Sequence, residues 1–259
     1  MSSKHGNPPE TRICGYDADS ITLRGKDLVH EVIGHFSFTG AFLLQALGRQ
    51  PTERQVTLVD AALVTIMEHG LVPSVVATRL TVHGAPESLQ GAVAAGLLGV
   101  GDRYAGTAGR CGELLERMLA SSDVDAEAQL IVAEHRATRT PVPGFGHPIH
   151  TGRDPRVDRL LALLPEADPA RTAMMALEQA ISSALGRPLV MNVSAALAAI
   201  LGAAQVPAPM MRGVVLVARC AGLVGHVLEE QTNPVGDALW HGAEAAVTYV
   251  DPEEQGPDQ

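Results

Sequence analysis

The sequence predicts an all-α fold with a small N-terminal β-hairpin. Over most of the 259 residues, apolar side chains recur at helical spacing, and turns that contain Pro or Gly separate the resulting segments. Aromatic residues make up only 3% of the chain, so Ala, Leu, Val and Met must build the core. This composition favours tightly packed helices.

The expected elements follow in order along the chain. Residues 11–24 alternate apolar and polar side chains around a turn-forming run at 17–20, which predicts the hairpin. Helical spacing then runs from Leu28 to Leu47, and Pro51 and Thr52 supply a stop and a new start. The further predicted helices span residues 53–69, 73–82, 87–101, 108–121, 124–138, 154–164, 168–186, 189–202 and 210–230.

Two features of the C-terminal third affect packing and order. The last predicted helix carries Gly213, Gly222 and Gly225, which permit close helix–helix contact in a core or a dimer interface although each lowers helix propensity. The tail at 251–259 is acidic and contains Pro and Gly, so we expect it to be disordered.

Charge and cysteine content narrow the function classes. The formal net charge of −10 argues against a general nucleic-acid binder and against binding to an anionic membrane. Cys14, Cys111 and Cys220 lack metal-ligand spacing, and their odd number fits a reduced, cytoplasmic setting. The polar opening of the chain predicts no signal peptide, and no uninterrupted apolar run is long enough to span a bilayer.

The most informative motif is the run Val142-Pro143-Gly144-Phe145-Gly146-His147, followed by Asp154-Pro155-Arg156. The two glycines allow a tight turn and a close approach to a ligand, and the proline stiffens the entry. Asp154 suits a helix N-cap and Pro155 the first helical position, which places Arg156 in the first turn, where anions bind. The same glycines also occur in ordinary surface turns, so the local pattern by itself leaves function open.

The string Gly-Phe-Gly-His followed by Asp-Pro-Arg resembles the signature of the citrate synthase superfamily, which includes the citryl-CoA lyase module of ATP citrate lyase. The resemblance extends over most of the chain, with further similar segments at 11–14, 23–28 and 48–52. Residues 68–74 are similar to the segment that supplies the family's second active-site histidine, here His69. On spacing alone, His69 is a helix-end residue that favours the negative end of the dipole.

Two segments depart from citrate synthase. Citrate synthases carry a histidine after an Ala/Gly-rich helix, whereas Gly101-Asp102-Arg103-Tyr104 resembles the citryl-CoA lyase segment instead. Asp102 and Arg103 would then line the substrate pocket, or form only a solvated helix-end pair. Met191-Asn192-Val193-Ser194 has serine where the family has an aspartate that exchanges a proton with the acetyl methyl group, and an unactivated hydroxyl is too weak a base for that step. Glu68 and Asp102 are candidates for the missing carboxylate.

The segment 217–226 resembles the family's C-terminal helix, in which an arginine binds a substrate carboxylate. Arg219 matches it, and an arginine among aliphatic residues needs an anionic partner. We interpret His226 in the same segment as a packing or interface histidine. A further synthase arginine has no counterpart at 231–234, which suggests a substrate with fewer carboxylates.

The resemblance implies carbon–carbon cleavage, or formation, of a 3-hydroxyacyl-CoA thioester. His147 would be the general base, and His69, a neutral donor or a positioned water would stabilise the enolate. Arg156 and Arg219 would hold the carboxylate, and Ser194 would contact the substrate or a water. The backbone of residues 142–146 would contact coenzyme A. No metal is required, and the sequence has no ligand cluster that suggests one.

The implied fold has a large helical domain from 1–104 and 206–259 and a small one from 105–205, with the site in a cleft that closes over the substrate. The implied active unit is a homodimer. Two alternatives stay open. One is a non-catalytic homologue that binds an acyl-CoA and a carboxylate, and the other, which the two departures disfavour, is a citrate synthase.

Overall fold

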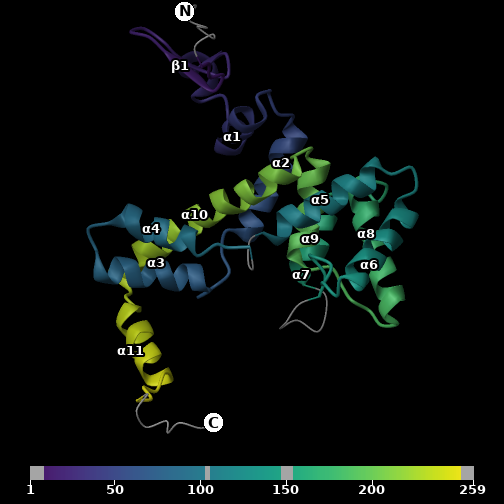
Figure 1. Cartoon of the computed structure of the whole chain (residues 1–259). Coiled ribbons are helices and arrows are strands. Elements are labelled where there is room, and N and C mark those ends of the chain that lie inside the picture. The colour runs from purple at the N-terminus through teal and green to yellow at the C-terminus, as the bar shows by residue number, and fades with distance from the viewer. Residues whose placement is uncertain (1–8, 103–105, 147–153, 252–259) are drawn as a thin grey trace, which may run out of the picture. The chain divides into compact units, whose positions relative to one another are not determined.

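A computed structural model describes residues 9–102, 106–146 and 154–251 (Figure 1). Over these ranges the chain is built from helices, with one three-stranded antiparallel sheet near the N-terminus. The predicted all-α class with a small β element is therefore confirmed. Two predicted site residues, Arg103 and His147, and residues 252–259 of the predicted disordered tail lie outside the described residues.

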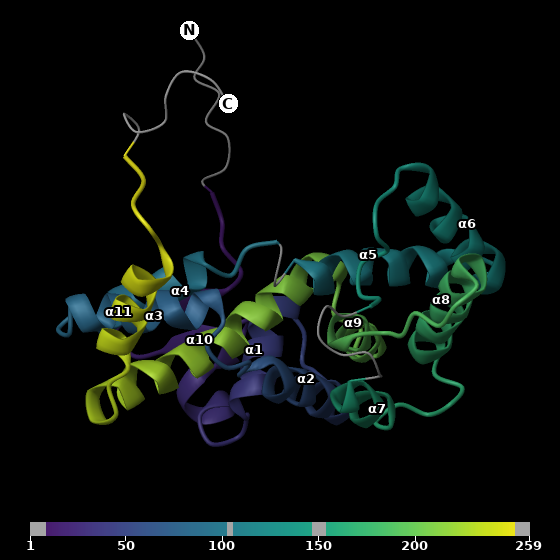
Figure 2. The ribbon, with the colours of Figure 1, turned by 90° about the horizontal axis from the view of Figure 1, so that it is seen from below.

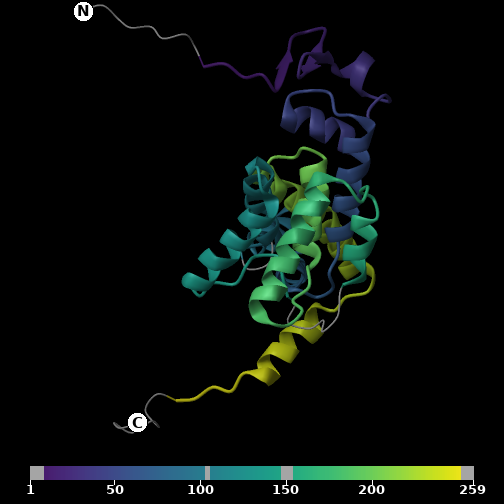
Figure 3. The ribbon, with the colours of Figure 1, turned by 90° about the vertical axis from the view of Figure 1, so that its right-hand side faces the viewer.

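The sheet extends the predicted hairpin by one strand. Strand β1 (Cys14–Tyr16) pairs with β2 (Ile21–Leu23), which also pairs with β3 (Lys26–Asp27), as the purple strands in Figure 3 show. Between β2 and β3, both Arg24 and Gly25 have positive φ, 50° and 82°. Two successive residues of that kind form the turn whose twist matches antiparallel strands.

The prediction of one helix from Leu28 to Leu47 is wrong. A five-residue π-helix, η1 (Leu28–Val32), begins after Asp27, whose carboxylate accepts hydrogen bonds from two amides of its first turn. Gly34 follows at a φ of 81°. The α-helix α1 (Phe38–Leu47) begins only after Ser37, whose hydroxyl accepts from the amide of Gly40 at 3.1 Å. The apolar spacing runs through this break, so periodicity alone conceals it.

The other predicted helices are present, with ends that differ by a few residues. They are α2 (Glu53–Ile66), α3 (Pro73–Gly84), α4 (Leu89–Leu98), α5 (Thr107–Ala120), α6 (Val124–Ala137), α7 (Pro155–Leu161), α8 (Pro169–Leu185), α9 (Val193–Ala203) and α10 (Ala208–Thr232). A further helix, α11 (Gly236–Ala246), was not predicted. Its start is held by Glu230 of α10, whose carboxylate accepts from the amides of Val235 and Gly236.

The chain divides into two compact units. Residues 1–62 and 111–208 form the first, and residues 63–110 and 209–259 form the second. The predicted division into 1–104 with 206–259 and 105–205 stays a prediction.

The first unit packs around α9. The helix is buried from Ala195 to Leu201, as expected of a core helix that is apolar on all sides. Helix α8 packs against α6 and α9, and α7 also packs on α9 (Figure 2). Their buried side chains include Val157, Leu160, Met174, Leu177 and Ile181. This packing supports both ends of residues 186–192, the segment that connects α8 to α9.

The second unit packs around the pair α3 and α4, with α11 against α3. Leu223 and Val227 of α10 share an apolar cluster with Val75, Val82 and Val93. Helix α10 is the one helix of the described residues that is long and apolar enough to cross a bilayer. Core helices of soluble proteins have the same length and composition, and in this unit α10 supplies core side chains.

Candidate active site

The loop at residues 142–146 is clamped to the segment that precedes α9. The amide of Gly146 donates to the carbonyl of Val190 at 2.8 Å, and the amide of Asn192 donates to the carbonyl of Gly144 at 2.9 Å. These bonds flank an antiparallel bridge between Phe145 and Met191. Main-chain pairing therefore fixes the path of the predicted coenzyme A loop up to the residue before His147.

Both glycines of this loop are required by its geometry. Gly144 has a φ of 87°, and a Cβ there would lie 2.5 Å from Sγ of Cys111 and 2.8 Å from Cβ of Ala195. Gly146 has a φ of 77°, and its Cβ would lie 3.1 Å from Leu189. L-residues with side chains avoid such φ values, and the loop packs too closely for an added methyl group.

The side chain of Asn192 completes the clamp. Its Nδ2 donates to the carbonyl of Gly146 at 3.0 Å, and its Oδ1 accepts from the amide of Ser194 at 2.9 Å as the N-cap of α9. Ser194 therefore lies in the first turn of α9, half-buried and one turn from the loop. Amide groups at such a helix N-terminus favour a negative charge nearby.

An apolar cavity of about 230 Å³ adjoins the loop. Val142 and Phe145 of the loop line it, together with Val132 and Arg136 of α6 and side chains from the end of α8. Arg136 is oriented by a 3.1 Å hydrogen bond from its Nη1 to the carbonyl of Ala184. The cavity thus combines apolar walls with two basic side chains, Arg136 and His135.

Arg156 lies in the first turn of α7, as predicted, and Asp154 is the N-cap. The buried Asp154 carboxylate accepts from the Arg156 amide at 2.9 Å and from Nη2 of the guanidinium at 2.7 Å. The expected anion position at this helix start is therefore occupied by a carboxylate of the chain itself. The role of Arg156 in binding substrate stays a prediction.

In the second unit, His69 lies in the turn at residues 67–70, between α2 and α3, and is exposed. Oε1 of Glu68 accepts from the amides of His69 and Gly70 at 2.8 and 2.6 Å. Partial burial raises the pKa of Glu68, but these bonds and the neighbouring His226 outweigh burial and leave the pKa below its ordinary value. A carboxylate held in this way is a weaker base, which counts against Glu68 as the replacement for the missing aspartate.

Asp102 and Arg219 also belong to the second unit. Asp102 is exposed and pairs with Nη1 of Arg212 at 2.5 Å, so it forms a solvated ion pair. Arg219 is 9% exposed on α10, which confirms the expected burial of its side chain. The structure thus brings Ser194 close to the 142–146 loop, while His69, Asp102 and Arg219 lie on separate elements of the second unit.

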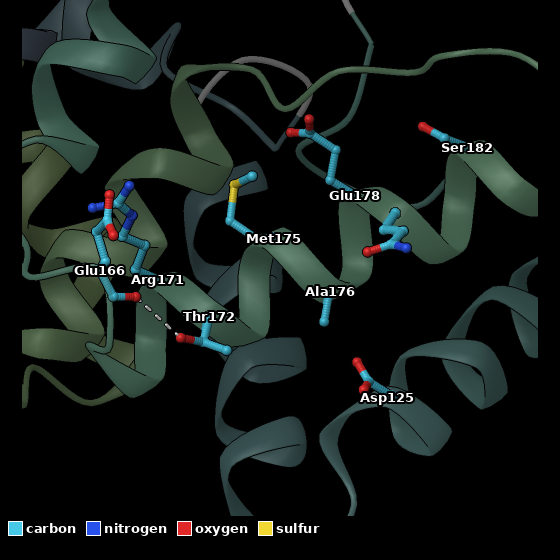
Figure 4. Close-up of a pocket in the computed structure, with 9 residues that line it drawn as sticks. Asp125, Glu166, Arg171, Thr172, Met175, Ala176, Glu178 and Ser182 are labelled. Atoms are coloured by element: carbon cyan, nitrogen blue, oxygen red, sulfur yellow. Dashed lines mark hydrogen bonds between the residues drawn. The ribbon is translucent and has the colours of Figure 1, made fainter.

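A larger polar cavity, of about 460 Å³, lies along α8 (Figure 4). Three carboxylates, those of Asp125, Glu166 and Glu178, line it beside a single arginine, Arg171. An excess of negative charge repels anionic ligands, so this cavity does not fit a substrate that carries phosphates or carboxylates. Among the described residues, no group of three His, Cys, Asp or Glu side chains could hold a metal ion.

Asp154 was predicted as an N-cap, which the structure confirms, but Asn192 was missed as a support of the site. The Asn192 side chain holds the 142–146 loop and the start of α9 by hydrogen bonds. The signal for Asn192 was its position before an apolar helix, which is typical of an N-cap. Its second bond, to residue 146, has no signal in the sequence.

Residues 19–239 match the family described as citrate synthase, C-terminal domain. Citryl-CoA lyase from Hydrogenobacter thermophilus is 29% identical, with a TM-score of 0.82 and 96% of each chain covered. ATP citrate lyase from Methanothrix soehngenii, in complex with citrate and coenzyme A, is 18% identical at a TM-score of 0.76, with 99% of this chain and 44% of that one covered. Citrate synthase from Thermotoga maritima MSB8 is 19% identical at a TM-score of 0.63, with 86% of this chain and 59% of that one covered. No curated protein matches the chain.

Proposed function

The chain belongs to the citrate synthase family, and on that premise we propose that it is a citryl-CoA lyase-like enzyme. It would cleave, or form, the carbon–carbon bond of a 3-hydroxy-carboxyacyl-CoA. Cleavage would yield acetyl-CoA or a similar acyl-CoA and a 2-oxo acid such as oxaloacetate. The observation that carries the proposal is the similarity to citryl-CoA lyase, which extends over nearly the full length of both chains.

The clamped loop supports coenzyme A as the carrier of the substrate. Residues 142–146 present their backbone beside an apolar cavity to which Arg136 adds a positive charge. Apolar walls suit the pantetheine arm or the adenine ring, and an arginine suits a phosphate. The complex of ATP citrate lyase with citrate and coenzyme A agrees with a carboxylated thioester as the substrate class.

The proposed cleavage begins at the substrate hydroxyl. His147 accepts its proton, the carbon–carbon bond breaks, and the electron pair moves onto the thioester carbonyl, where His69 stabilises the enolate. Arg156 and Arg219 hold the carboxylates. Because Nε and Nη2 of Arg156 bind Asp154, the substrate would contact the Nη1 edge of that guanidinium.

The enolate must then gain a proton at carbon, and Ser194 replaces the family's proton donor. We propose that solvent supplies this proton through a water held by the Ser194 hydroxyl at the start of α9. The substitution Ser194→Asp should speed the step by on the order of tenfold or more, because a carboxyl group at this position can donate the proton to the enolate carbon directly. Ser183→Asp, at an exposed position on α8, is the matched control and should leave the rate unchanged.

The test is mass-spectrometric detection of acetyl-CoA or propionyl-CoA after the protein is mixed with citryl-CoA, citramalyl-CoA or malyl-CoA. Release should occur with the wild type and disappear in His147→Ala, while His241→Ala, at an exposed position on α11, should behave as wild type. Absence of release from every thioester would contradict the proposal.

The alternative is a homologue that binds an acyl-CoA without turnover, and Ser194 is the observation that favours it. Calorimetric titration with coenzyme A separates the two functions, since a binder gives heat of binding but no product. Citrate synthase activity is the weaker alternative and predicts formation of citrate from acetyl-CoA and oxaloacetate. A homodimer and a cytoplasmic location stay predictions.

A further inference from the structure

The 67–70 turn that carries His69 is tied to the core of the second unit by a chain of side chains. Oε2 of Glu68 pairs with Nε2 of His226 on α10 at 2.9 Å. The other ring nitrogen of His226, Nδ1, accepts from Nε of Arg79 on α3 at 3.1 Å. His226 therefore bridges a turn that is 158 residues away in the sequence and a helix residue that is 147 residues away.

The far end of this series of hydrogen bonds is buried and ion-paired. The side chain of Arg79 is 4% exposed, and its guanidinium pairs with Glu229 and, at 2.7 Å, with the buried Glu230. Glu230 also accepts from the amides of Val235 and Gly236 at the start of α11. Burial raises the pKa of Glu230, but its bonds with Arg79 and these amides outweigh burial and leave the pKa below its ordinary value.

The donors and acceptors of this chain define the tautomer of His226. A guanidinium only donates hydrogen bonds, so Nδ1 must carry the lone pair that accepts from Arg79. The proton of the neutral imidazole is then on Nε2, which donates it to Glu68. The Glu68 carboxylate in turn accepts from the His69 and Gly70 amides with its other oxygen. Each group is thus assigned as either the donor or the acceptor of each hydrogen bond, so the network has only one arrangement.

Close packing brings α10 against the same turn. A Cβ at Gly222 of α10 would overlap with the carbonyl oxygen of Met67 and lie 3.4 Å from Oε2 of Glu68. The turn is thus held by van der Waals contact on one side and by a directed hydrogen-bond chain on the other. Its backbone has little freedom to move, even though the side chain of Glu68 is 49% exposed.

From these contacts we infer that Glu68 and His226 are positioning residues that fix the backbone of His69 for the cleavage step. This inference rests on the proposed function, in which His69 stabilises the enolate. A hydrogen-bond donor for an enolate must be placed before the charge forms, and a shift of about 1 Å in its position costs up to about a hundredfold in rate. His226 and Glu68 act through His69 and do not touch the substrate.

The test compares three variants of the full chain. His226→Leu removes both ring bonds at similar volume, whereas His226→Gln keeps one acceptor and one donor. We expect kcat on the cleaved thioester to fall by on the order of tenfold in His226→Leu, with KM within about twofold of wild type, and to recover largely in His226→Gln. His241→Leu is the control, because it removes an exposed His–Glu pair, to Glu244 at 3.0 Å, on α11.

A second readout does not depend on turnover. In ¹H–¹⁵N spectra, the amide signals of His69 and Gly70 should shift in His226→Leu and stay in place in His241→Leu. Glu68→Gln, which keeps an acceptor for these amides but turns a donor toward His226, should lower kcat without adding to the effect of His226→Leu. If His226→Leu does not fold, Glu68→Gln still tests the inference through the same amide signals.

Two results would overturn the inference. One is unmoved His69 and Gly70 signals in both Glu68→Gln and folded His226→Leu. The other is a kcat that stays at the wild-type value although these signals move. If the wild type cleaves no thioester, the proposed function fails by itself, and the amide signals still decide whether Glu68 and His226 hold the turn.

Discussion

The 142–146 loop and the 67–70 turn each lead to a histidine of the proposed site, but different forces hold them. Main-chain hydrogen bonds to residues 190–192 and two glycines hold the loop. Side chains from α3 and α10 hold the turn through the chain Glu68, His226 and Arg79. The loop therefore depends on its two glycines and on one side chain, that of Asn192, whereas the turn depends on each side chain that holds it.

The largest expected effect comes from the glycine that the loop cannot replace. Gly144→Ala should lower the free energy of unfolding by about 4 kcal/mol, because strain at positive φ adds to overlap with Cys111 and Ala195. Gly186→Ala is the matched control: its φ is 65° and a Cβ there would meet nothing within 4 Å, so about 1 kcal/mol is expected. Equal losses in urea denaturation would mean that packing against the loop contributes nothing.

The turn has its own critical residue. Arg79→Met should cost about 3 kcal/mol of unfolding free energy, since it leaves Glu230 buried without its cation but still bonded to two amides. Arg117→Met breaks a more exposed pairing with Glu127 and Glu134 and should cost about 1 kcal/mol or less. Chemical denaturation checks both variants, and a cost for Arg79→Met no larger than that for Arg117→Met would contradict the buried role.

A smaller effect tests the side chain that supports the loop. Asn192→Ala should cost about 2 kcal/mol, because it removes the cap of α9 and the bond to the Gly146 carbonyl. Asp123→Ala removes only a cap, at the start of α6, and should cost about 1 kcal/mol. If thermal unfolding gives the same loss for both, the second bond of Asn192 has no energetic weight.

The smallest effect is the pH dependence of the turn. Because the pKa of Glu68 is lower in the folded protein than in the unfolded chain, the carboxylate stabilises the fold at neutral pH, and this contribution is lost as the pH falls through the folded pKa. The difference in unfolding free energy between wild type and Glu68→Gln should be below about 1 kcal/mol at pH 7 and shrink below about pH 4. If the difference instead grows as the pH falls, folding raises the pKa of Glu68 rather than lowering it.

Local sequence signals predicted most of the helices. Asp154-Pro155 was predicted to place an N-cap before a proline, and α7 begins there. The start of α8 has the same pair, Asp168 and Pro169. Prediction failed where apolar spacing does not mark the end of a helix. Helix α11 starts at amides held by the side chain of Glu230, and Gly34 and Ser37 divide a stretch whose apolar spacing is continuous.

In the candidate site, too, local properties of the sequence could be predicted, whereas contacts between distant residues could not. The glycines of the 142–146 loop were predicted because positive φ is a property of a single residue. His226 was interpreted as a packing histidine, and its two partners could not be predicted because the fold alone brings Glu68 and Arg79 to its ring nitrogens. The pairing of Asp102 with Arg212 of α10 was likewise not predicted.

The sequence by itself determined the helical class, the family signature and the glycine-hinged loop, because spacing, capping and backbone conformation are local properties. Only the tertiary structure decided that Asn192 fastens the loop to α9 and that Glu68 and His226 hold the His69 turn. These are contacts between side chains and segments that are distant in the sequence. Their energies depend on burial and orientation, which exist only once the chain has packed.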